Sequence, residues 1–507
     1  MLAVATARAL PAHRLALLSL SLSISTVTGD EAFLAGNAHY ARGELEEARE
    51  AYNECLKAQP DRTDCAINLA SVLVDIGPQH EALAETLYRS VLAADDKYAA
   101  DAAYNLGLLL QDRKGDEATR EAAIMYQRAT SSDPRRWDAW ANMATALSQL
   151  KFNKRAVEPF QRAILILEET QQAAPDQAVE GTDEYLGQLY YGLGMALAAL
   201  SDEECAELAA APETLLIGLD AEGGASAVKG SAARICRENA LNALRTSATL
   251  QPDEPQAEHM LQALLSEAGE GEGDDALSRA SPQFVRKLFD DFSDTFDTQL
   301  EALKYRVPQM VAEVVGALVT MRGEAYGSAF DAGCGTGLAG PLLRPHILGA
   351  LVGVDLSEKM LERAAALRQG DAPTSPPVYD KLFAADLLTL RRSDVLPGGG
   401  GDVGVDLVTA ADVLVYFGEL RELLGAFAAL SALGGDLVFS CERATADEAP
   451  QGWRLRPSGR FAHTKAYVVA SAADAGYSLV GYKEIVPRYE NGEPVPGQLF
   501  TFRRGGP

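Results

Sequence analysis

Cysteine is scarce in this chain, with six residues among 507, and none has the spacing of a metal site. No CxxC pair occurs, and no histidine lies near a cysteine at ligand spacing, so we expect no bound metal. A chain of this length needs no disulfide framework, so we expect reduced, mostly buried thiols. The six are Cys55, Cys65, Cys205, Cys236, Cys334 and Cys441.

Basic residues are outnumbered, and long apolar runs are missing. The chain has 45 lysines and arginines against 72 aspartates and glutamates, a net charge of −27. Because a phosphate backbone repels such a surface, we expect no nucleic-acid partner. No apolar run is long enough to span a bilayer, so we expect no membrane span. The length predicts two or more domains, and the 47% share of hydrophobic residues is typical of globular protein.

Acidic residues are absent from residues 1–29, which carry Arg8, His13 and Arg14 before the apolar run LALLSLSLSISTV. This pattern is typical of a targeting peptide, with an unstructured tail as the alternative. The apolar run suits a secretory signal, whereas the serines suit a transit peptide. Because unpaired cysteines weigh against secretion, we expect a cytoplasmic or organellar protein, mitochondrial or plastid, after cleavage.

Residues 30–268 repeat a pattern of small residues, an aromatic residue and a closing proline. The first unit has Gly36, then Ala48 and Tyr52, and ends at Pro60. Small residues let two helices touch, and the aromatic ring fills the gap between them. The pattern resembles the tetratricopeptide repeat, a pair of antiparallel helices of about 34 residues. Further units contain Asn68, Asn105, Asn142 and Gly192.

This resemblance implies an all-helical solenoid, because one helix pair cannot bury its apolar face and stacked pairs can. An insertion at 201–231 interrupts the last unit, and a helix at 256–265 is expected to cap the stack. We expect the concave groove to hold a protein partner, with a scaffold or dimer surface as the alternative. The glycine-rich, acidic segment GEGEGDD lies within a linker, residues 269–282, before a second domain at 283–507.

The stretch AFDAGCGTGL, residues 329–338, ends an apolar strand and opens a helix through a glycine-rich turn. Glycine there lets the backbone approach a ligand closely. The turn also satisfies the GxGxxG pattern of dinucleotide-binding dehydrogenases. Three later apolar strands each end near an acid: Asp355, Asp386 and Asp412. An acid about 20 residues beyond the glycines can bind both ribose hydroxyls.

This succession of motifs resembles class I S-adenosylmethionine-dependent methyltransferases more closely than dehydrogenases. The family has a Rossmann-like, seven-stranded sheet, and strands at 478–482 and 498–502 match its final hairpin. The resemblance assigns the methionine end of S-adenosyl-L-methionine to Asp331, Gly333, Gly335 and Gly337, the ribose to Asp355, the adenine to Leu356, Asp386 and Leu387, and the side facing the acceptor to Ala410.

The segments LFDDF at 288–292 and LKYRVP at 303–308 are similar to the entry segment of methyltransferases that carry a tetratricopeptide array. This segment is expected to close over the pocket. Tyr305 and Arg306 lie on it, and Arg306 is expected to pair with the cofactor's carboxylate or to form a surface ion pair.

The methyl group of a sulfonium is already activated, so catalysis consists mainly of alignment and exclusion of water. If the acceptor must lose a proton, the candidate bases are His463, Asp412 and Tyr416. The alternative for His463 is a structural role at the start of a helix near Thr464. Arg460 is a candidate to bind an anionic acceptor.

Three functions remain open. The chain could methylate a small molecule, perform methyl transfer to a protein presented by the repeats, or act as a non-catalytic adaptor. The intact glycines and acids weigh against the adaptor. The sequence AADV replaces an NPPY-like motif after the fourth strand, which disfavours methylation of glutamine or adenine amino groups. We therefore expect a small-molecule methyltransferase.

Overall fold

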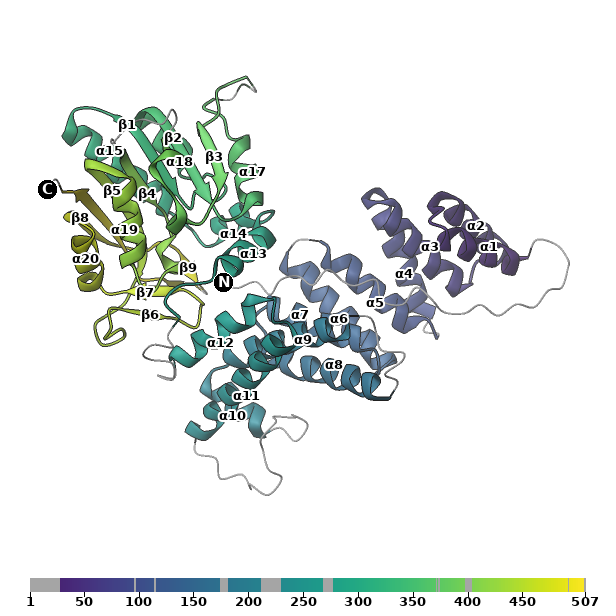
Figure 1. Cartoon of the computed structure of the whole chain (residues 1–507). Helices are drawn as coiled ribbons and strands as arrows, with labels where there is room; N and C mark the ends of the chain where they lie inside the picture. Colours follow the sequence, from purple (N-terminus) through teal and green to yellow (C-terminus); the bar gives the residue numbers. More distant parts are fainter. Residues whose placement is uncertain are drawn as a thin grey trace. The chain divides into compact units, whose positions relative to one another are not determined.

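The computed structural model in Figure 1 describes residues 28–94, 97–113, 115–173, 181–210, 229–267, 277–370, 372, 374–396, 404–490 and 492–505. All but the last two residues of the expected targeting peptide and most of the expected linker lie outside these residues. The chain divides between Pro252 and Asp253 into two compact units.

The N-terminal unit is made of helices that pack in consecutive pairs. The pairs are α1 (Gly29–Ala41) with α2 (Leu45–Ala58), α3 (Thr63–Ile76) with α4 (Glu81–Ala94), α5 (Ala99–Gln111) with α6 (Asp116–Ser132), α7 (Trp137–Gln149) with α8 (Asn153–Ala173), and α9 (Thr182–Ala198) with α11 (Lys229–Leu250). A 3-10 turn at Pro78–His80 precedes α4, and α10 (Asp202–Ala210) lies in the expected insertion.

Glycine and an aromatic ring form the contact within a pair, as the sequence predicts. A Cβ atom at Gly36 would lie 2.5 Å from the ring of Tyr52, and one at Gly107 would lie 2.6 Å from Tyr126. Both tyrosines are fully buried. A larger residue at either glycine would therefore push the two helices apart.

The expectation of reduced thiols is wrong for Cys55 and Cys65, which form a disulfide. Cys55 lies near the end of α2 and Cys65 near the start of α3, so the turn between the helices brings their Cα atoms to 6.4 Å. Ten residues of sequence separation do not reveal this proximity. The other four cysteines are buried and unbonded, as expected.

The C-terminal unit is a sheet between two layers of helices (Figure 1). Its strands are β1 (Tyr326–Ala332), β2 (Ile347–Asp355), β3 (Lys381–Ala384), β4 (Val405–Ala410), β5 (Ser431–Arg443), β8 (Tyr477–Ile485) and β11 (Gly497–Arg504), in the order β3-β2-β1-β4-β5-β11-β8. The first five strands in this order, β3, β2, β1, β4 and β5, run parallel to one another. Strand β11 is antiparallel to both of its neighbours, β5 and β8. This confirms the Rossmann-like expectation, including the final hairpin.

Shorter elements extend this sheet and cover it. The short strands are β6 (Trp453–Leu455) and β7 (Phe461–His463) beside β5, and the separate hairpin β9 (Tyr489–Glu490) with β10 (Glu493–Pro494). The helices are α12 (Pro255–Glu267), α13 (Pro282–Phe292), α14 (Phe296–Ala302), α15 (Val307–Arg322), α16 (Gly340–Leu343), α17 (Glu358–Ala366), α18 (Arg392–Val395), α19 (Arg421–Leu430) and α20 (Lys465–Asp474), with 3-10 turns at Arg344–His346, Leu387–Thr389 and Leu414–Tyr416.

Two apolar cores bury the two faces of the sheet. Helices α15 and α17 pack on one face, and α18, α19 and α20 pack on the other. Because strands buried on both faces are apolar throughout, β1, β2 and β4 have almost no alternation of polar residues. The carboxyl ends of these parallel strands all meet at one edge of the sheet.

Helix α12 belongs to the C-terminal unit, whereas the sequence predicts a cap on the repeat array. The ring of His259 stacks on Phe284 of α13 with centroids 4.0 Å apart, and its Nε2 lies 2.8 Å from the carbonyl oxygen of Gly459. These contacts join α12 to two parts of the C-terminal unit that are distant in sequence.

Candidate functional site

The glycine-rich turn follows β1 directly and is built from left-handed backbone. Gly333, Gly335 and Gly337 have φ angles of 65°, 54° and 87°. A Cβ atom at Gly333 would lie 2.4 Å from Cγ2 of Val413, and one at Gly337 would lie 2.7 Å from Cδ1 of Leu367. Both conformation and space therefore require glycine at these two positions.

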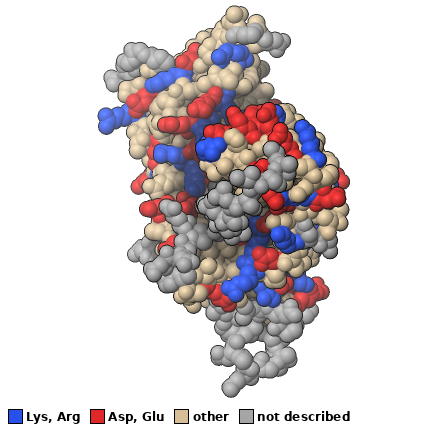
Figure 2. Space-filling model, turned by 90° about the vertical axis from the view of Figure 1, so that its right-hand side faces the viewer, with Lys and Arg blue, Asp and Glu red and all other residues tan. Residues whose placement is uncertain are grey.

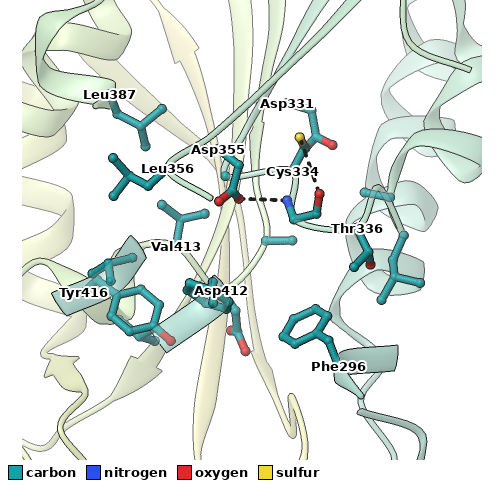
Figure 3. Close-up of a pocket in the computed structure, with 18 of the residues that line it drawn as sticks. Phe296, Asp331, Cys334, Thr336, Asp355, Leu356, Leu387, Asp412, Val413 and Tyr416 are labelled. Carbon is teal, nitrogen blue, oxygen red and sulfur yellow. Dashed lines mark hydrogen bonds between the residues drawn. The ribbon is translucent and has the colours of Figure 1, made fainter. Parts of the chain in front are cut away.

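A pocket opens above this turn at the carboxyl ends of the strands. Figure 3 shows Asp355, Leu356 and Leu387 on one side of it, Cys334 and Thr336 on another, and Asp412, Tyr416 and Phe296 below. Eleven of the predicted site residues line it: Tyr305, Asp331, Gly333, Gly335, Asp355, Leu356, Asp386, Leu387, Asp412, Tyr416 and Arg460.

Asp355, at the end of β2, holds the turn in place. Its Oδ2 accepts a hydrogen bond from the Gly335 N–H at 2.9 Å (Figure 3), and its Oδ1 accepts one from the Ser357 N–H at 3.0 Å. Burial raises the pKa of this carboxyl, while the backbone donors oppose that shift. Asp355 thus links the second strand to the first turn at the pocket floor.

Asp331 lies at the end of β1 and is almost fully buried. The hydroxyls of Tyr379 and Thr409 donate to its two oxygens at 2.7 and 2.9 Å. Burial raises the pKa of Asp331 to about 6, against the effect of these two donors. Because neighbouring side chains engage both oxygens, Asp331 joins β1 to β4 and to the segment before β3 beneath the turn.

Asp386 is paired with Arg279, a residue that the sequence analysis did not identify. The Nη2 of Arg279 lies 2.8 Å from Oδ2 of Asp386, and the guanidinium lies 5.1 Å from the ring centroid of Phe417. The segment that carries Arg279 is bonded to the pocket wall, because the Ala280 N–H donates a hydrogen bond to the Tyr416 carbonyl oxygen at 2.8 Å. A motif search could not find Arg279, since it lies about a hundred residues before its partner.

The opposite end of the pocket is a network of arginines and carboxylates. Arg488 donates to Asp412 at 3.2 Å, to Glu490 at 2.9 Å and to Glu442. Arg460 donates through Nη1 to the same Glu490 oxygen at 2.7 Å. Asp412 has a φ of 58°, and the Ser440 hydroxyl donates to its Oδ1 at 3.1 Å. These bonds hold the Asp412 carboxylate in one place despite its left-handed backbone.

Four predicted site residues do not line the pocket. His463 is fully buried in β7, its Nε2 lies 3.1 Å from the Gly418 carbonyl oxygen, and burial lowers its pKa to about 4. Arg306 is mostly exposed and pairs with Glu313 at 4.0 Å, which fits the alternative of a surface ion pair. Gly337 packs against Leu367 at the end of the turn, and Ala410 belongs to one of the two apolar cores of the sheet.

The helix after His463 is capped by its neighbour. The Thr464 hydroxyl accepts a hydrogen bond from the Tyr467 N–H at 3.2 Å, at the start of α20. His463 is therefore structural through its bond to Gly418, and the helix cap is Thr464.

Aromatic residues of α13 and α14 close the pocket from the side. Phe289 and Phe296 line it, and both rings pack edge-on, with Phe289 also packed against Tyr416. The Thr336 hydroxyl of the turn donates to Asp297 of α14 at 2.7 Å. Helix α14, which lies between the LFDDF and LKYRVP segments of the predicted entry segment, thus reaches the glycine turn.

The pocket has the features that a sulfonium nucleoside requires. Bare backbone at Gly333 and Gly335 lies beside a carboxylate at Asp355 and an apolar side chain at Leu356. These groups suit a ribose and an adenine ring, and no lysine lines the pocket among the described residues. Within the described residues no cluster of ligands for a metal ion is found, and no helix could cross a membrane.

Comparison with known families classifies both units. Residues 330–437 match the model of a methyltransferase domain, and residues 30–72 match a tetratricopeptide repeat model. The C-terminal unit therefore contains a methyltransferase domain and the N-terminal unit a tetratricopeptide repeat, as predicted. No curated protein matches the chain significantly.

Several solved structures are similar at low identity. Magnesium protoporphyrin IX methyltransferase from Synechocystis PCC 6803, with bound S-adenosylhomocysteine, is 21% identical, covers 44% of this chain and 99% of its own, and has a TM-score of 0.34. A methyltransferase from Clostridium acetobutylicum is 15% identical, covers 43% and 99%, and has a TM-score of 0.31. The classification rests on the family matches and not on these scores.

Proposed function

We propose that the C-terminal unit transfers a methyl group from S-adenosylmethionine to a small-molecule acceptor bound in the same pocket. The observation that supports this proposal is a single cavity that extends from the glycine turn to Asp412 and Tyr416, so that cofactor and acceptor can lie side by side in it. Its walls are largely apolar and aromatic, which suits a small organic molecule.

The chain's own residues bind the cofactor in this proposal. The turn at Gly333 and Gly335 holds the methionine end, Asp355 binds the ribose hydroxyls, and Leu356 packs on the adenine. Asp386 and the backbone of Leu387 read the adenine edge, with Arg279 fixing the orientation of the Asp386 carboxylate. When bound, the cofactor supplies an electrophilic methyl group.

The remaining residues align the acceptor and exclude water. Phe289 and Phe296 cover the cavity from α13 and α14, and Asp412 and Tyr416 face it from the other side. His463 lies outside the cavity, so we do not assign it a role in proton transfer. Alignment and desolvation are the main contributions that such a site can make.

The repeat array is proposed to bind a protein partner, because stacked helix pairs present a groove for peptides. Acidic and basic side chains are interspersed on the face that Figure 2 shows. Such a mixed surface suits a protein partner better than a nucleic acid.

A labelled methyl transfer experiment tests the proposal. Purified protein and methyl-labelled S-adenosylmethionine are added to a cell extract, which is then split into protein and small-molecule fractions. We expect label in the small molecules. Label confined to protein would show a protein methyltransferase, and cofactor binding by calorimetry without any transfer would show an adaptor.

A further inference from the structure

The polar groups at the Asp412 end of the pocket are mostly hydrogen-bond donors. Arg460, Arg488, Tyr305 and Tyr416 all line this end, and Asp412 is its one carboxylate among the described lining residues. Arginine can only donate, and a protonated tyrosine donates one bond. A ligand that fits here must therefore supply acceptor oxygens.

Each of the three side-chain nitrogens of Arg488 already donates a hydrogen bond, and each oxygen of Asp412 already accepts one. Arg488 is almost fully buried and donates to three carboxylates, Asp412 among them. Arg460 differs, because its hydrogen bonds to Glu490 and to the Tyr416 hydroxyl leave other N–H groups of its five for a ligand. Its side chain is 20% exposed and lines the cavity.

Among the described lining residues, Asp331 has the carboxyl whose pKa burial raises to about 6, but both of its oxygens accept hydrogen bonds from the Tyr379 and Thr409 hydroxyls and are not open to an acceptor. Histidine and lysine are absent from the described lining of the pocket. Burial raises the pKa of Tyr305 and Tyr416, so both hydroxyls stay protonated, and it raises the pKa of the Cys334 thiol as well. The oxygens of Asp355 accept hydrogen bonds from the backbone, and those of Asp386 accept from Arg279 and from the Leu388 N–H. An acceptor here has to be nucleophilic without losing a proton.

The rest of the cavity wall is apolar. Phe289, Phe296, Leu300, Leu303 and Val415 line it between the glycine turn and the donors. A ligand with an apolar body and one charged end would bury the body against these side chains. Each buried methylene contributes about 0.8 kcal/mol, so the body adds affinity while the charge sets orientation.

We propose that the acceptor is an apolar carboxylic acid, held by Arg460 and Tyr416 and methylated on its carboxylate oxygen. This inference rests on the proposed methyltransferase function. A carboxylate oxygen bonds to the methyl carbon as the carbon–sulfur bond breaks and its electron pair stays on sulfur. The products are a methyl ester and S-adenosylhomocysteine. No proton is transferred, which accounts for a pocket without a base open to the acceptor.

Binding to the wild-type protein is the first test. The protein is saturated with S-adenosylhomocysteine, and calorimetry or ligand-observed NMR measures benzoate, phenylacetate and octanoate against benzamide, phenylacetamide and octanamide. We expect the acids to bind and the matched amides to bind at least about tenfold more weakly, since charge-assisted hydrogen bonds contribute roughly 1.5–3 kcal/mol. Equal binding of acids and amides, or no binding of any acid, would overturn the inference.

Substitution of Arg460 is the second test. Arg460→Gln should weaken binding of the tightest acid about tenfold or more and leave binding of S-adenosylhomocysteine unchanged. Arg454→Gln is the matched control, because Arg454 lies on the neighbouring strand β6 and does not line the pocket. If Arg460→Gln does not fold, Tyr416→Phe gives the same comparison with one hydroxyl removed. Acid affinity unchanged in the folded variant contradicts the assignment.

The product distinguishes this inference from the proposed function. Small molecules labelled in the extract experiment are treated with mild base, which releases volatile methanol from methyl esters. Volatile label supports the inference. Base-stable label leaves methyl transfer intact and rejects the carboxylate acceptor, whereas failure to bind S-adenosylhomocysteine rejects the proposed function itself.

Discussion

The two ends of the pocket hold their polar groups by different means. At the turn, short side chains at strand ends bond to nearby backbone, as Asp355 does to Gly335. At the opposite end, Arg488 reaches from the segment before β9 to Asp412, Glu442 and Glu490. The first end depends on local backbone geometry, and the second depends on a buried network of charges. Each should therefore fail in its own way when a residue is replaced.

Arg488→Met should have the largest effect, on stability. It leaves Glu442, with a side chain 2% exposed, and Asp412 without their main cation. Breaking one partner of a buried ion pair costs about 3–5 kcal/mol, which urea unfolding would measure. Arg421→Met is the control, since its pair with Glu419 is exposed on both sides and should contribute under about 1 kcal/mol. If both variants lost the same stability, the buried charge network would contribute no more than an exposed ion pair, and this end of the pocket would not depend on it.

Asp355→Ala should act on cofactor affinity. Loss of the carboxylate removes the ribose contact and the bond that holds Gly335, at a cost of about 1–3 kcal/mol in binding. Calorimetry with S-adenosylhomocysteine measures it. Asp474→Ala, on the exposed surface, should leave the affinity unchanged. Unaltered binding by the Asp355 variant would show that the ribose assignment is wrong.

His463→Gln should change how stability depends on pH. Burial lowers the pKa of folded His463 to about 4, against about 6.5 unfolded, so the unfolded chain binds a proton first as pH falls. Wild type therefore loses stability between about pH 6.5 and pH 4, with about 2 kcal/mol from this residue by pH 5. The variant should lack that loss, whereas His346→Gln should retain it. Unfolding curves at pH 7 and pH 5 measure the difference, and equal slopes would contradict the structural role.

Gly333→Ala should have the smallest effect, mainly on the turn. The left-handed backbone costs an alanine about 1–2 kcal/mol, and its Cβ would also press on Val413. Gly434→Ala has a similar φ of 78° and open space around it. Gly434→Ala should show the backbone cost alone and Gly333→Ala a larger loss of stability, and only Gly333→Ala should weaken binding of S-adenosylhomocysteine, about tenfold. If the two variants bound S-adenosylhomocysteine with the same affinity, the turn at Gly333 would not be part of the cofactor site.

Residues that are close in the sequence within short motifs also lie together in the structure. The order of strands, the glycine turn and the acids at 355 and 386 all lie within short motifs, and the structure places them around one pocket. The repeat contacts at Gly36 and Gly107 were equally local. Prediction failed for Arg279, Arg488 and the disulfide of Cys55 with Cys65, whose partners are set by folding.

His463 shows why residue type alone misleads. A histidine near the last motif has a suitable unperturbed pKa for a base, and nothing in the sequence says that β7 turns its ring into the core. Arg306 likewise sits beside Tyr305 in the sequence, yet only Tyr305 lines the pocket. Adjacent residues point in different directions once the backbone is placed.

The sequence by itself determined the two units, the methyltransferase class and the turn, because these depend on periodicity and on glycine backbone at fixed spacing. Only the tertiary structure decided which charged side chains line the pocket and which of them are bonded to neighbouring charges. Long side chains such as those of Arg460 and Arg488 are positioned by packing and buried ion pairs between distant segments, and no local pattern encodes those contacts.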